Sequence, residues 1–398
     1  MSIPVAAHQV VLIPGFFGFE ALGELRYFAG VARTLESALK ARGLDADVVE
    51  LPTLPTASIR HRAASVLDRV GALVARTTGP LHLIGHSTGG LDARLALAPT
   101  ASLPSEQAQK AIFERVQTVV TVSTPHLGTP LASFFASAAG KPLLRVFALT
   151  MGALLQERRL PLNIALGLGR LLTRADDLLG LRNTTVDELY RGLLSDFGSE
   201  RREAIAEMLE QIASDQSLIF QLTPAAVDLF NSATADPEGV RYGSVVTRAR
   251  SPGLASMRDI GRDVYAQGLH GLFAGLYALS GRHVETPLLP AHQEALERIY
   301  GEVPPVRAND GIVPTRSQVW GEVITGTMGD HLDLVGHYRT EREGFSSDWL
   351  PSSSGFDDED FDRVWGEVAR FIAEDRVVDR QDPAVRGLPA NDAAAEKQ

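Results

Sequence analysis

The decapeptide LHLIGHSTGG at residues 81–90 constrains the fold more than any other stretch of this chain. Its first four residues are an apolar run that predicts a short, fully buried strand. The next five match Gly-X-Ser-X-Gly, and the leucine spacing that follows predicts a helix. A serine between a buried strand and a helix, flanked by glycines, is typical of a sharp turn that presents a nucleophilic hydroxyl. Ser87 is therefore a candidate nucleophile, and the alternative is a chance match in a glycine-rich chain.

Strands and helices are predicted to alternate along the chain. Further strands are predicted at residues 9–13, 46–51, 116–122, 239–247 and 318–324, and helices at 28–42, 58–76 and 361–374. This alternation predicts an α/β fold with a mostly parallel sheet and helices on both faces. Ligands bind at the carboxyl ends of the strands in such sheets. The loops at 14–18, 85–89 and 123–128 are predicted to meet at that edge.

The domain organisation is predicted from breaks in this alternation. Residues 1–130 and 236–375 are predicted to form the two parts of one core, with a helical insertion at about 254–303. Residues 131–235 are rich in leucine and arginine and are predicted to form an inserted helical cap or lid. The polar tail at 376–398 is predicted to be disordered.

The composition narrows the classes of partner and compartment. The net charge is −11 without a basic cluster, which argues against nucleic acid as a partner. The chain has no cysteine, so disulfides and thiolate metal sites are excluded. The apolar stretch 268–281 is shorter than the ~20 residues of a membrane span. The first residues lack the positive region of a signal peptide, so a cytoplasmic location is expected, or secretion if a leader has been removed.

A nucleophilic serine needs a base and a carboxylate that orients the base. On folds with this turn, the acid and then the histidine follow the serine along the chain. His331 follows the last predicted strand and is the predicted base, with His337 as the alternative. Asp310, in the turn-like Asn-Asp-Gly, is the predicted acid. Asp330 and Asp333 compete for that role, but Asp330 is badly placed to orient the adjacent ring.

Backbone N–H groups are needed to stabilise the oxyanion that develops during attack on a carbonyl. The sequence predicts these donors at Thr88, directly after the serine, and at Phe16, after the first strand. His86, His126 and Asp92 also lie close to the turn in sequence. We interpret them as packing, hydrogen-bonding or ion-pairing residues rather than catalytic ones.

Several segments together resemble the α/β-hydrolase superfamily, and more closely the bacterial family I triacylglycerol lipases and esterases. The matching segments occur in the family's order and include VVLIPGFFG, LHLIGHSTGGLDAR, VVTVSTPHLGTPLA, GVRYGSVV, NDGIVP and HLDLVGH. The resemblance implies a triad of Ser87, Asp310 and His331, an oxyanion hole at Phe16 and Thr88, and a mobile lid. The first motif departs from the family, which usually has His-Gly where this chain has Ile-Pro-Gly.

The resemblance also implies a structural calcium ion, although the reaction itself requires no cofactor. Asp333 matches one calcium ligand of the family. The second carboxylate is expected shortly before residue 309, within 254–303, and is not identifiable there. His337 stands where the family has a glutamine ligand. A single carboxylate is a poor site, because calcium takes six or more oxygen ligands.

The leading hypothesis is a serine hydrolase that cleaves lipid-like or apolar carboxylic esters through an acyl-enzyme. The same triad could serve a thioester, a lactone, a polyester or acyl transfer, and a non-catalytic binding protein is the third hypothesis. Residues 141–182 carry seven basic and three acidic residues and many leucines. They are predicted either to rest on a lipid interface or to pack on the protein's own core with a solvated basic face.

Overall fold

The computed structural model describes residues 7–16, 21–22, 25–103, 109–137, 140, 217–282, 286–342 and 348–374. The predicted cap at 131–235 lies mostly outside the described residues, and its basic stretch lies wholly outside them. The predicted tail at 376–398 is also outside. The core and part of the predicted insertion at 254–303 are within the described residues.

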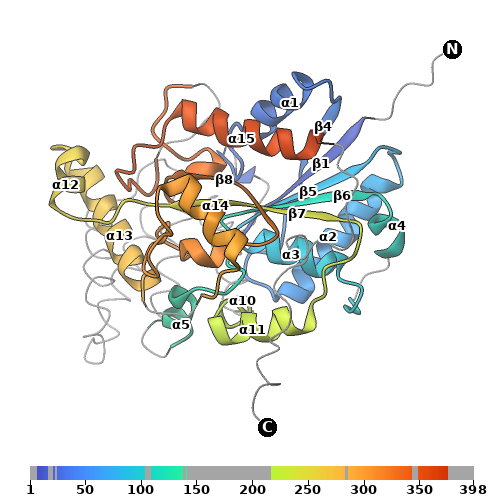
Figure 1. The fold of residues 1–398 in the computed structure, drawn as a ribbon, viewed down its shortest axis with the longest axis horizontal. Coiled ribbons are helices and arrows are strands. Elements are labelled where there is room, and N and C mark those ends of the chain that lie inside the picture. Colours follow the sequence, from blue (N-terminus) through green and yellow to red (C-terminus); the bar gives the residue numbers. More distant parts are fainter. Residues whose placement is uncertain are drawn as a thin grey trace, which may run out of the picture.

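Six strands form one parallel sheet in the order β4-β1-β5-β6-β7-β8 (Figure 1). Their bounds are β1 His8–Ile13, β4 Ala46–Glu50, β5 Leu81–His86, β6 Val116–Val122, β7 Arg241–Arg248 and β8 Glu322–Met328. The parallel α/β architecture predicted from the sequence is confirmed. A small antiparallel pair, β2 (Ala21–Leu22) and β3 (Leu25–Arg26), was not predicted.

The last strand begins later than predicted. Gln318 instead ends a short 3-10 helix, η2 (Thr315–Gln318), and β8 begins at Glu322. The Gln318 side chain accepts the backbone N–H of Thr247 at 2.7 Å, so it bonds across to β7 from within a turn. Its amide therefore fixes the turn before β8, and the prediction of a strand from residue 318 was wrong at its start.

Two layers of helix cover the sheet (Figure 1). On one face lie α1 (Val31–Lys40) and α15 (Asp358–Ala373), and on the other lie α2 (Ile59–Val74), α3 (Thr88–Leu97) and α4 (Gln109–Phe113). Alternate residues of β1 point into the two cores: Val10 and Leu12 into the first, Val11 and Ile13 into the second. This period of two explains why the strand is apolar along its whole length.

The remaining described helices follow β6 along the chain. They are α5 (Pro130–Ala136), α10 (Ser217–Gln221), α11 (Pro224–Ala233), α12 (Leu254–Ile260), α13 (Val264–Ser280) and α14 (Pro290–Tyr300), with a second 3-10 turn, η3 (Asp333–Val335). The part of 254–303 that is described is thus mainly helical. α14 packs on β8, while α5 contacts both α10 and α13.

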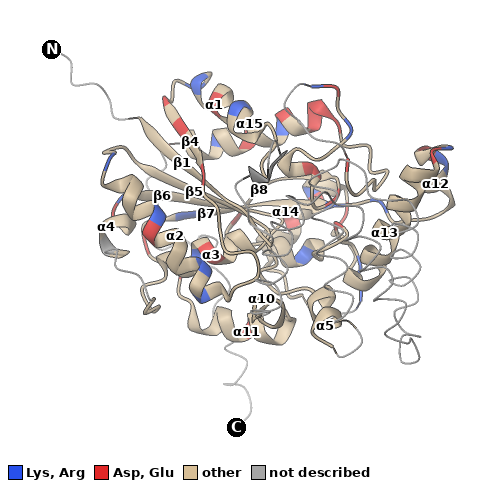
Figure 2. Ribbon diagram, turned by 180° about the vertical axis from the view of Figure 1, so that it is seen from behind, with Lys and Arg blue, Asp and Glu red and all other residues tan. Residues whose placement is uncertain are grey.

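Figure 2 shows lysine and arginine interspersed with aspartate and glutamate on the helices around the sheet. Within the described part of the chain, no helix is both long enough and apolar enough to cross a membrane.

Candidate active site

Ser87 lies at the tight turn between β5 and α3. Its backbone has φ 53° and ψ −127°, a conformation that is strained for a residue with a side chain. The Ser87 N–H donates to the Val122 carbonyl at 2.8 Å and ties the turn to β6. A Cβ at Gly89 would lie 2.2 Å from the Ile13 carbonyl oxygen, so only glycine fits there. The turn therefore has the strand–turn–helix context that the sequence predicts.

Asp310 and His331 are brought together by the loops on either side of β8. The His331 Nδ1 lies 2.8 Å from Asp310 Oδ2, and the His331 N–H donates to the Asp310 carbonyl at 3.0 Å. Both residues are buried, Asp310 completely. Since Nδ1 is engaged by the carboxylate, Nε2 is the ring nitrogen left to exchange a proton with another group.

Asp310 is held by four further hydrogen bonds to its carboxylate. Oδ1 accepts the N–H groups of Ile312 and Val313 at 2.9 and 2.7 Å. Oδ2 accepts the Thr247 hydroxyl at 2.9 Å and the Gln318 amide at 3.1 Å. These donors fix the direction of the carboxylate. Neither Asp330 nor Asp333, the competing candidates for the acid, bonds to the His331 ring in the described structure.

Ser87, Thr88, Phe16 and His331 line one cavity. Most of the other residues of its wall are apolar, among them Leu131, Phe135, Ile219, Leu222, Ile312, Val313, Leu332, Val335 and Leu350. A hydroxyl, a histidine and few other polar groups in an apolar wall suit a ligand with a polar centre and an apolar chain.

A chain of hydrogen bonds joins the loop of Phe16 to the loop of His331. The Gly15 N–H donates to the Tyr27 hydroxyl at 2.9 Å, and that hydroxyl lies 2.7 Å from His86 Nδ1. His86 Nε2 lies 2.9 Å from the His331 carbonyl oxygen. Because a carbonyl only accepts, His86 Nε2 donates and Nδ1 accepts from Tyr27. Burial, and then repulsion by His331, lowers the pKa of His86 well below its usual value, which fits this neutral tautomer.

A buried ion pair lies beneath the same loop. Arg62 on α2 and Asp92 on α3 are fully buried and 2.7 Å apart. Arg62 Nη2 also donates to the carbonyl oxygens of Pro14 and Gly15 at 3.0 and 3.1 Å, and to the Thr88 hydroxyl at 3.3 Å. One guanidinium thus connects the two segments in which the oxyanion donors are expected. Asp92 forms an ion pair, as expected, whereas Arg62 and Tyr27 were not anticipated from the sequence.

His126 and His337 are engaged elsewhere. His126 stacks on Trp320 and lies 3.1 Å from the Thr121 hydroxyl. His337 donates from Nε2 to the Tyr27 carbonyl at 3.0 Å and stacks on Trp349. Burial lowers the pKa of His337 to about 3, so this ring is neutral at pH 7.

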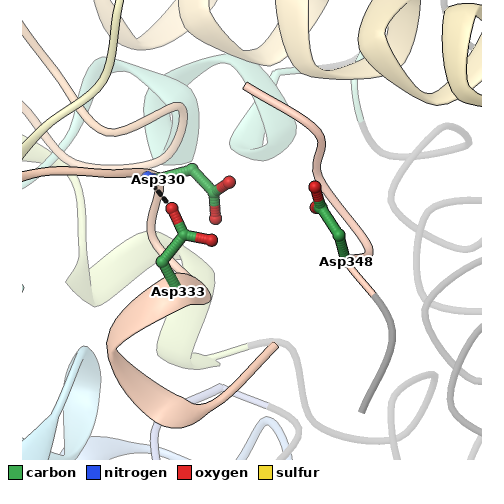
Figure 3. Close-up of side chains that lie close together, drawn as sticks. All are labelled: Asp330, Asp333 and Asp348. Carbon is green, nitrogen blue, oxygen red and sulfur yellow. Dashed lines mark hydrogen bonds between the residues drawn. The ribbon is translucent and has the colours of Figure 1, made fainter. Parts of the chain in front are cut away.

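Three aspartates gather beside the His331 loop (Figure 3). Asp330, Asp333 and Asp348 each present a carboxylate oxygen within 4.8 Å of the other two. The Asp330 N–H donates to Asp333 Oδ2 at 2.7 Å. The partners of Asp333 in this group are Asp330 and Asp348. Neither lies within 254–303, where a second carboxylate was expected.

The surroundings of this cluster disfavour three uncompensated negative charges. Burial raises the pKa of Asp330 well above its usual value, and repulsion by Asp348 adds to the effect. Burial also raises the pKa of Asp333, and repulsion by Asp330 and Asp348 adds to the effect. Burial raises the pKa of Asp348 to about 7. Asp330 Oδ2 and Asp348 Oδ1 are buried oxygens without a hydrogen-bond partner among the described residues. Oxygen donors of this kind fit the calcium ion that the family resemblance implies.

One protein family and several solved structures are similar to this chain. Residues 58–160, which include Ser87, match a family profile described as "Putative serine esterase (DUF676)". No curated protein sequence matches the chain.

Three solved structures are similar to this chain over most of its length. Lipase 1 from Pelosinus fermentans is 16% identical and has a TM-score of 0.52. The alignment covers 94% of this chain and 100% of the lipase chain. EstA from Clostridium botulinum is 19% identical, with 94% and 89% covered and a TM-score of 0.46. The lipase of Staphylococcus hyicus is 16% identical, with 92% and 95% covered and a TM-score of 0.46. With the parallel sheet and the strand–turn–helix at Ser87, the first likeness shows that this chain has the α/β-hydrolase fold.

Proposed function

We propose that this protein is a serine carboxylic ester hydrolase of lipase or esterase type, with Ser87, Asp310 and His331 as its catalytic triad. The observation that carries the proposal is the Asp310–His331 hydrogen bond of 2.8 Å beside a cavity that also contains the strained Ser87. The match of residues 58–160 to a serine esterase family supports the same chemistry.

In the proposed first half-reaction, the Ser87 hydroxyl attacks the carbonyl carbon of the ester. His331 Nε2 takes the hydroxyl proton, and Asp310 stabilises the imidazolium through Nδ1. The carbonyl oxygen becomes an oxyanion that accepts hydrogen bonds from the backbone N–H groups of Phe16 and Thr88. The carbon–oxygen bond to the alcohol then breaks, and His331 returns the proton to the leaving alcohol.

The second half-reaction releases the acid. A water molecule gives a proton to His331 Nε2 as its oxygen attacks the carbonyl carbon of the acyl-enzyme. The bond to the Ser87 oxygen breaks, and the serine regains its proton from His331. The apolar wall of the cavity suits an acyl chain, so lipid-like or apolar esters are the proposed substrate class.

The test is hydrolysis of p-nitrophenyl esters from acetyl to palmitoyl, with and without an emulsified interface. We expect wild-type turnover to exceed that of Ser87→Ala by on the order of 10⁴-fold or more. Ser232→Ala is the control, since Ser232 is an exposed serine on α11. Its hydroxyl donates to the Asp228 carbonyl, and it does not line the cavity.

The range of chain lengths then separates a lipase from an esterase. Activity on palmitoyl esters that increases at the interface indicates a lipase, and activity limited to short chains indicates an esterase. If Ser87→Ala retains wild-type turnover, or no ester in the series is cleaved, the proposed ester hydrolase activity is wrong.

A further inference from the structure

We propose that Tyr27 and His86 are positioning residues, which together hold the loop of Phe16 at a fixed place relative to His331. They act through the backbone of these two loops, and neither exchanges a proton with the substrate. The inference rests on the proposed hydrolase function and deepens it. It assigns the relative placement of the oxyanion donor and the base to two side chains outside the triad.

The first end of this connection is the peptide between Pro14 and Gly15. Its N–H donates to the Tyr27 hydroxyl at 2.9 Å, and its carbonyl accepts Arg62 Nη2 at 3.0 Å. Glycine rotates freely about its own backbone bonds, so the next peptide, which carries the Phe16 N–H, keeps its direction only if its surroundings are fixed. Without the Tyr27 hydroxyl, the Gly15 N–H would be a buried donor that has lost its partner.

The other end is the backbone of His331. Its N–H donates to the Asp310 carbonyl at 3.0 Å, and its carbonyl accepts His86 Nε2 at 2.9 Å. The ring of His86 is fully buried, and its centroid lies 4.7 Å from that of the His331 ring. His86 therefore supports both the backbone and the ring of the proposed base.

The hydrogen bonds between the two ends run in one direction. The Gly15 N–H can only donate and the His331 carbonyl can only accept, so the Tyr27 hydroxyl donates to His86 Nδ1, 2.7 Å away. Burial raises the pKa of Tyr27 above its usual value, so the hydroxyl keeps the proton that it donates. Each side chain thus accepts from one neighbour and donates to the next, and hydrogen bonds in such a chain strengthen one another.

The backbone of the Tyr27 segment is attached to the chain that follows His331. The Tyr27 carbonyl accepts His337 Nε2 at 3.0 Å, and the Ala29 N–H donates to the Val335 carbonyl at 2.8 Å. A displacement of the His331 loop is therefore passed to Tyr27 through its backbone as well as through His86. The Tyr27 hydroxyl then passes it to the loop of Phe16.

Steady-state kinetics tests the proposal on two single variants. Tyr27→Phe removes only the hydroxyl, whereas His86→Gln can keep an N–H for the His331 carbonyl but loses the acceptor for Tyr27. We expect each to lower kcat about 10- to 100-fold with KM little changed, because misplaced donors affect the transition state most. Inhibition by an alkyl trifluoromethyl ketone, a transition-state analogue, is expected to weaken by the same factor as kcat/KM.

Two matched controls separate positioning from stability. Tyr277→Phe removes the hydroxyl of a half-buried tyrosine on α13, which lies 2.9 Å from the Ser251 hydroxyl. His292→Gln changes a buried histidine on α14 whose Nε2 donates to the Gly321 carbonyl at 3.0 Å. Neither side chain lines the cavity, so both controls are expected to keep wild-type kcat even where their Tm falls.

The double variant Tyr27→Phe/His86→Gln tests whether the two side chains act as one connection. Breaking a chain at a second place adds little, so the double variant is expected to lose no more than the more impaired single variant. Independent roles would instead multiply the two losses. A multiplied loss, or single variants with wild-type kcat, would overturn the proposal.

Nuclear magnetic resonance tests the connection without any substrate. In protein labelled with ¹⁵N-phenylalanine and ¹⁵N-histidine, His86→Gln is expected to shift both the Phe16 amide and the His331 ring signals, whereas His292→Gln is not. If the Phe16 amide does not shift, the proposal is wrong. If the wild type cleaves no ester, the proposed function fails and this spectrum still decides the connection. If Tyr27→Phe does not fold, His86→Asn takes its place beside His86→Gln.

Discussion

Asp310 receives donors from three separate parts of the chain: β7, the turn before β8 and the loop of His331. Five hydrogen bonds to one carboxylate leave it little freedom to rotate. Its orientation, rather than its charge alone, selects the tautomer of His331 in which Nε2 is free to accept a proton.

Asp310→Asn tests this orientation. An amide can present an N–H to Nδ1, which favours the wrong tautomer and leaves Nε2 protonated. We expect kcat to fall on the order of 10⁴-fold with KM little changed. Steady-state kinetics on the best ester of the series measures the effect, with Asp228→Asn as the control. A loss of less than tenfold would mean that Asp310 does not orient the base.

Arg62 is a positioning residue for the proposed oxyanion hole. Arg62→Lys keeps the positive charge but cannot contact Asp92, Pro14 and Gly15 at once. We expect kcat to fall about 10- to 100-fold with KM nearly unchanged, because misplaced oxyanion donors affect the transition state most. Arg60→Lys, on the exposed side of the same helix, is the control. If Arg62→Lys lowers the Tm but leaves kcat unchanged, Arg62 contributes to stability alone.

At the scale of elements, the turn between β5 and α3 depends on close backbone contact. A Cβ at Gly85 would lie 2.4 Å from Gly89, and one at Gly15 would lie 2.6 Å from the Ser87 Cβ. β5, the loop of Gly15 after β1, and α3 therefore approach one another more closely than residues with a Cβ would allow. This contact is what sets the Ser87 hydroxyl at the edge of the sheet.

Two glycine substitutions separate this contact from ordinary helix propensity. Gly89→Ala forces a Cβ against the Ile13 carbonyl, and we expect it to lower the free energy of unfolding by more than about 3 kcal/mol. Gly366→Ala lies within α15, where a Cβ meets nothing within 4 Å, and is expected to stabilise by about 0.5–1 kcal/mol. Urea unfolding measures both. Equal effects of the two changes would contradict the close-contact explanation.

The elements that were predictable from the sequence are those with local patterns. β6 has the predicted bounds, and β5 and α3 follow from the glycines and apolar run around Ser87. Arg62 had a weaker signal, since it lies on the apolar stripe of α2 with Ile59, Val66 and Val70. An arginine in such a stripe indicates a buried partner. Asp348 had no signal, because it lies 15 residues after Asp333 and no local pattern connects the two.

At the scale of the whole molecule, the described structure buries several neutral histidines. Burial is the largest cause that lowers the pKa of His82 and His337 to about 3, and that of His86 and His126 well below the usual value. His82 and His86 lie at opposite ends of β5, His126 follows β6, and His337 follows η3 and lines the cavity. Their effect on stability is therefore not confined to the cavity.

We expect the buried neutral histidines to destabilise the fold below about pH 6.5, whereas the raised pKa values of Asp330, Asp333 and Asp348 act in the opposite direction. Between the low folded pKa and the usual unfolded value, the unfolded chain binds more protons, so the free energy of unfolding falls as pH falls. Each histidine contributes a slope of about 1.4 kcal/mol per pH unit in that window. Urea unfolding from pH 7.5 to 5 at fixed calcium measures the slope. His82→Gln should change the wild-type slope by one histidine's share, and a slope that the substitution leaves unchanged would contradict the prediction.

The order of the strands has a consequence for how the protein becomes active during its synthesis. From β5 to β8 the sheet follows the order of the chain, and the loops of Asp310 and His331 flank its last strand. A ribosome completes Ser87 more than two hundred residues before His331. The nascent Ser87 therefore lacks its proposed base until β8 pairs with β7, and a chain that terminates early is released without His331.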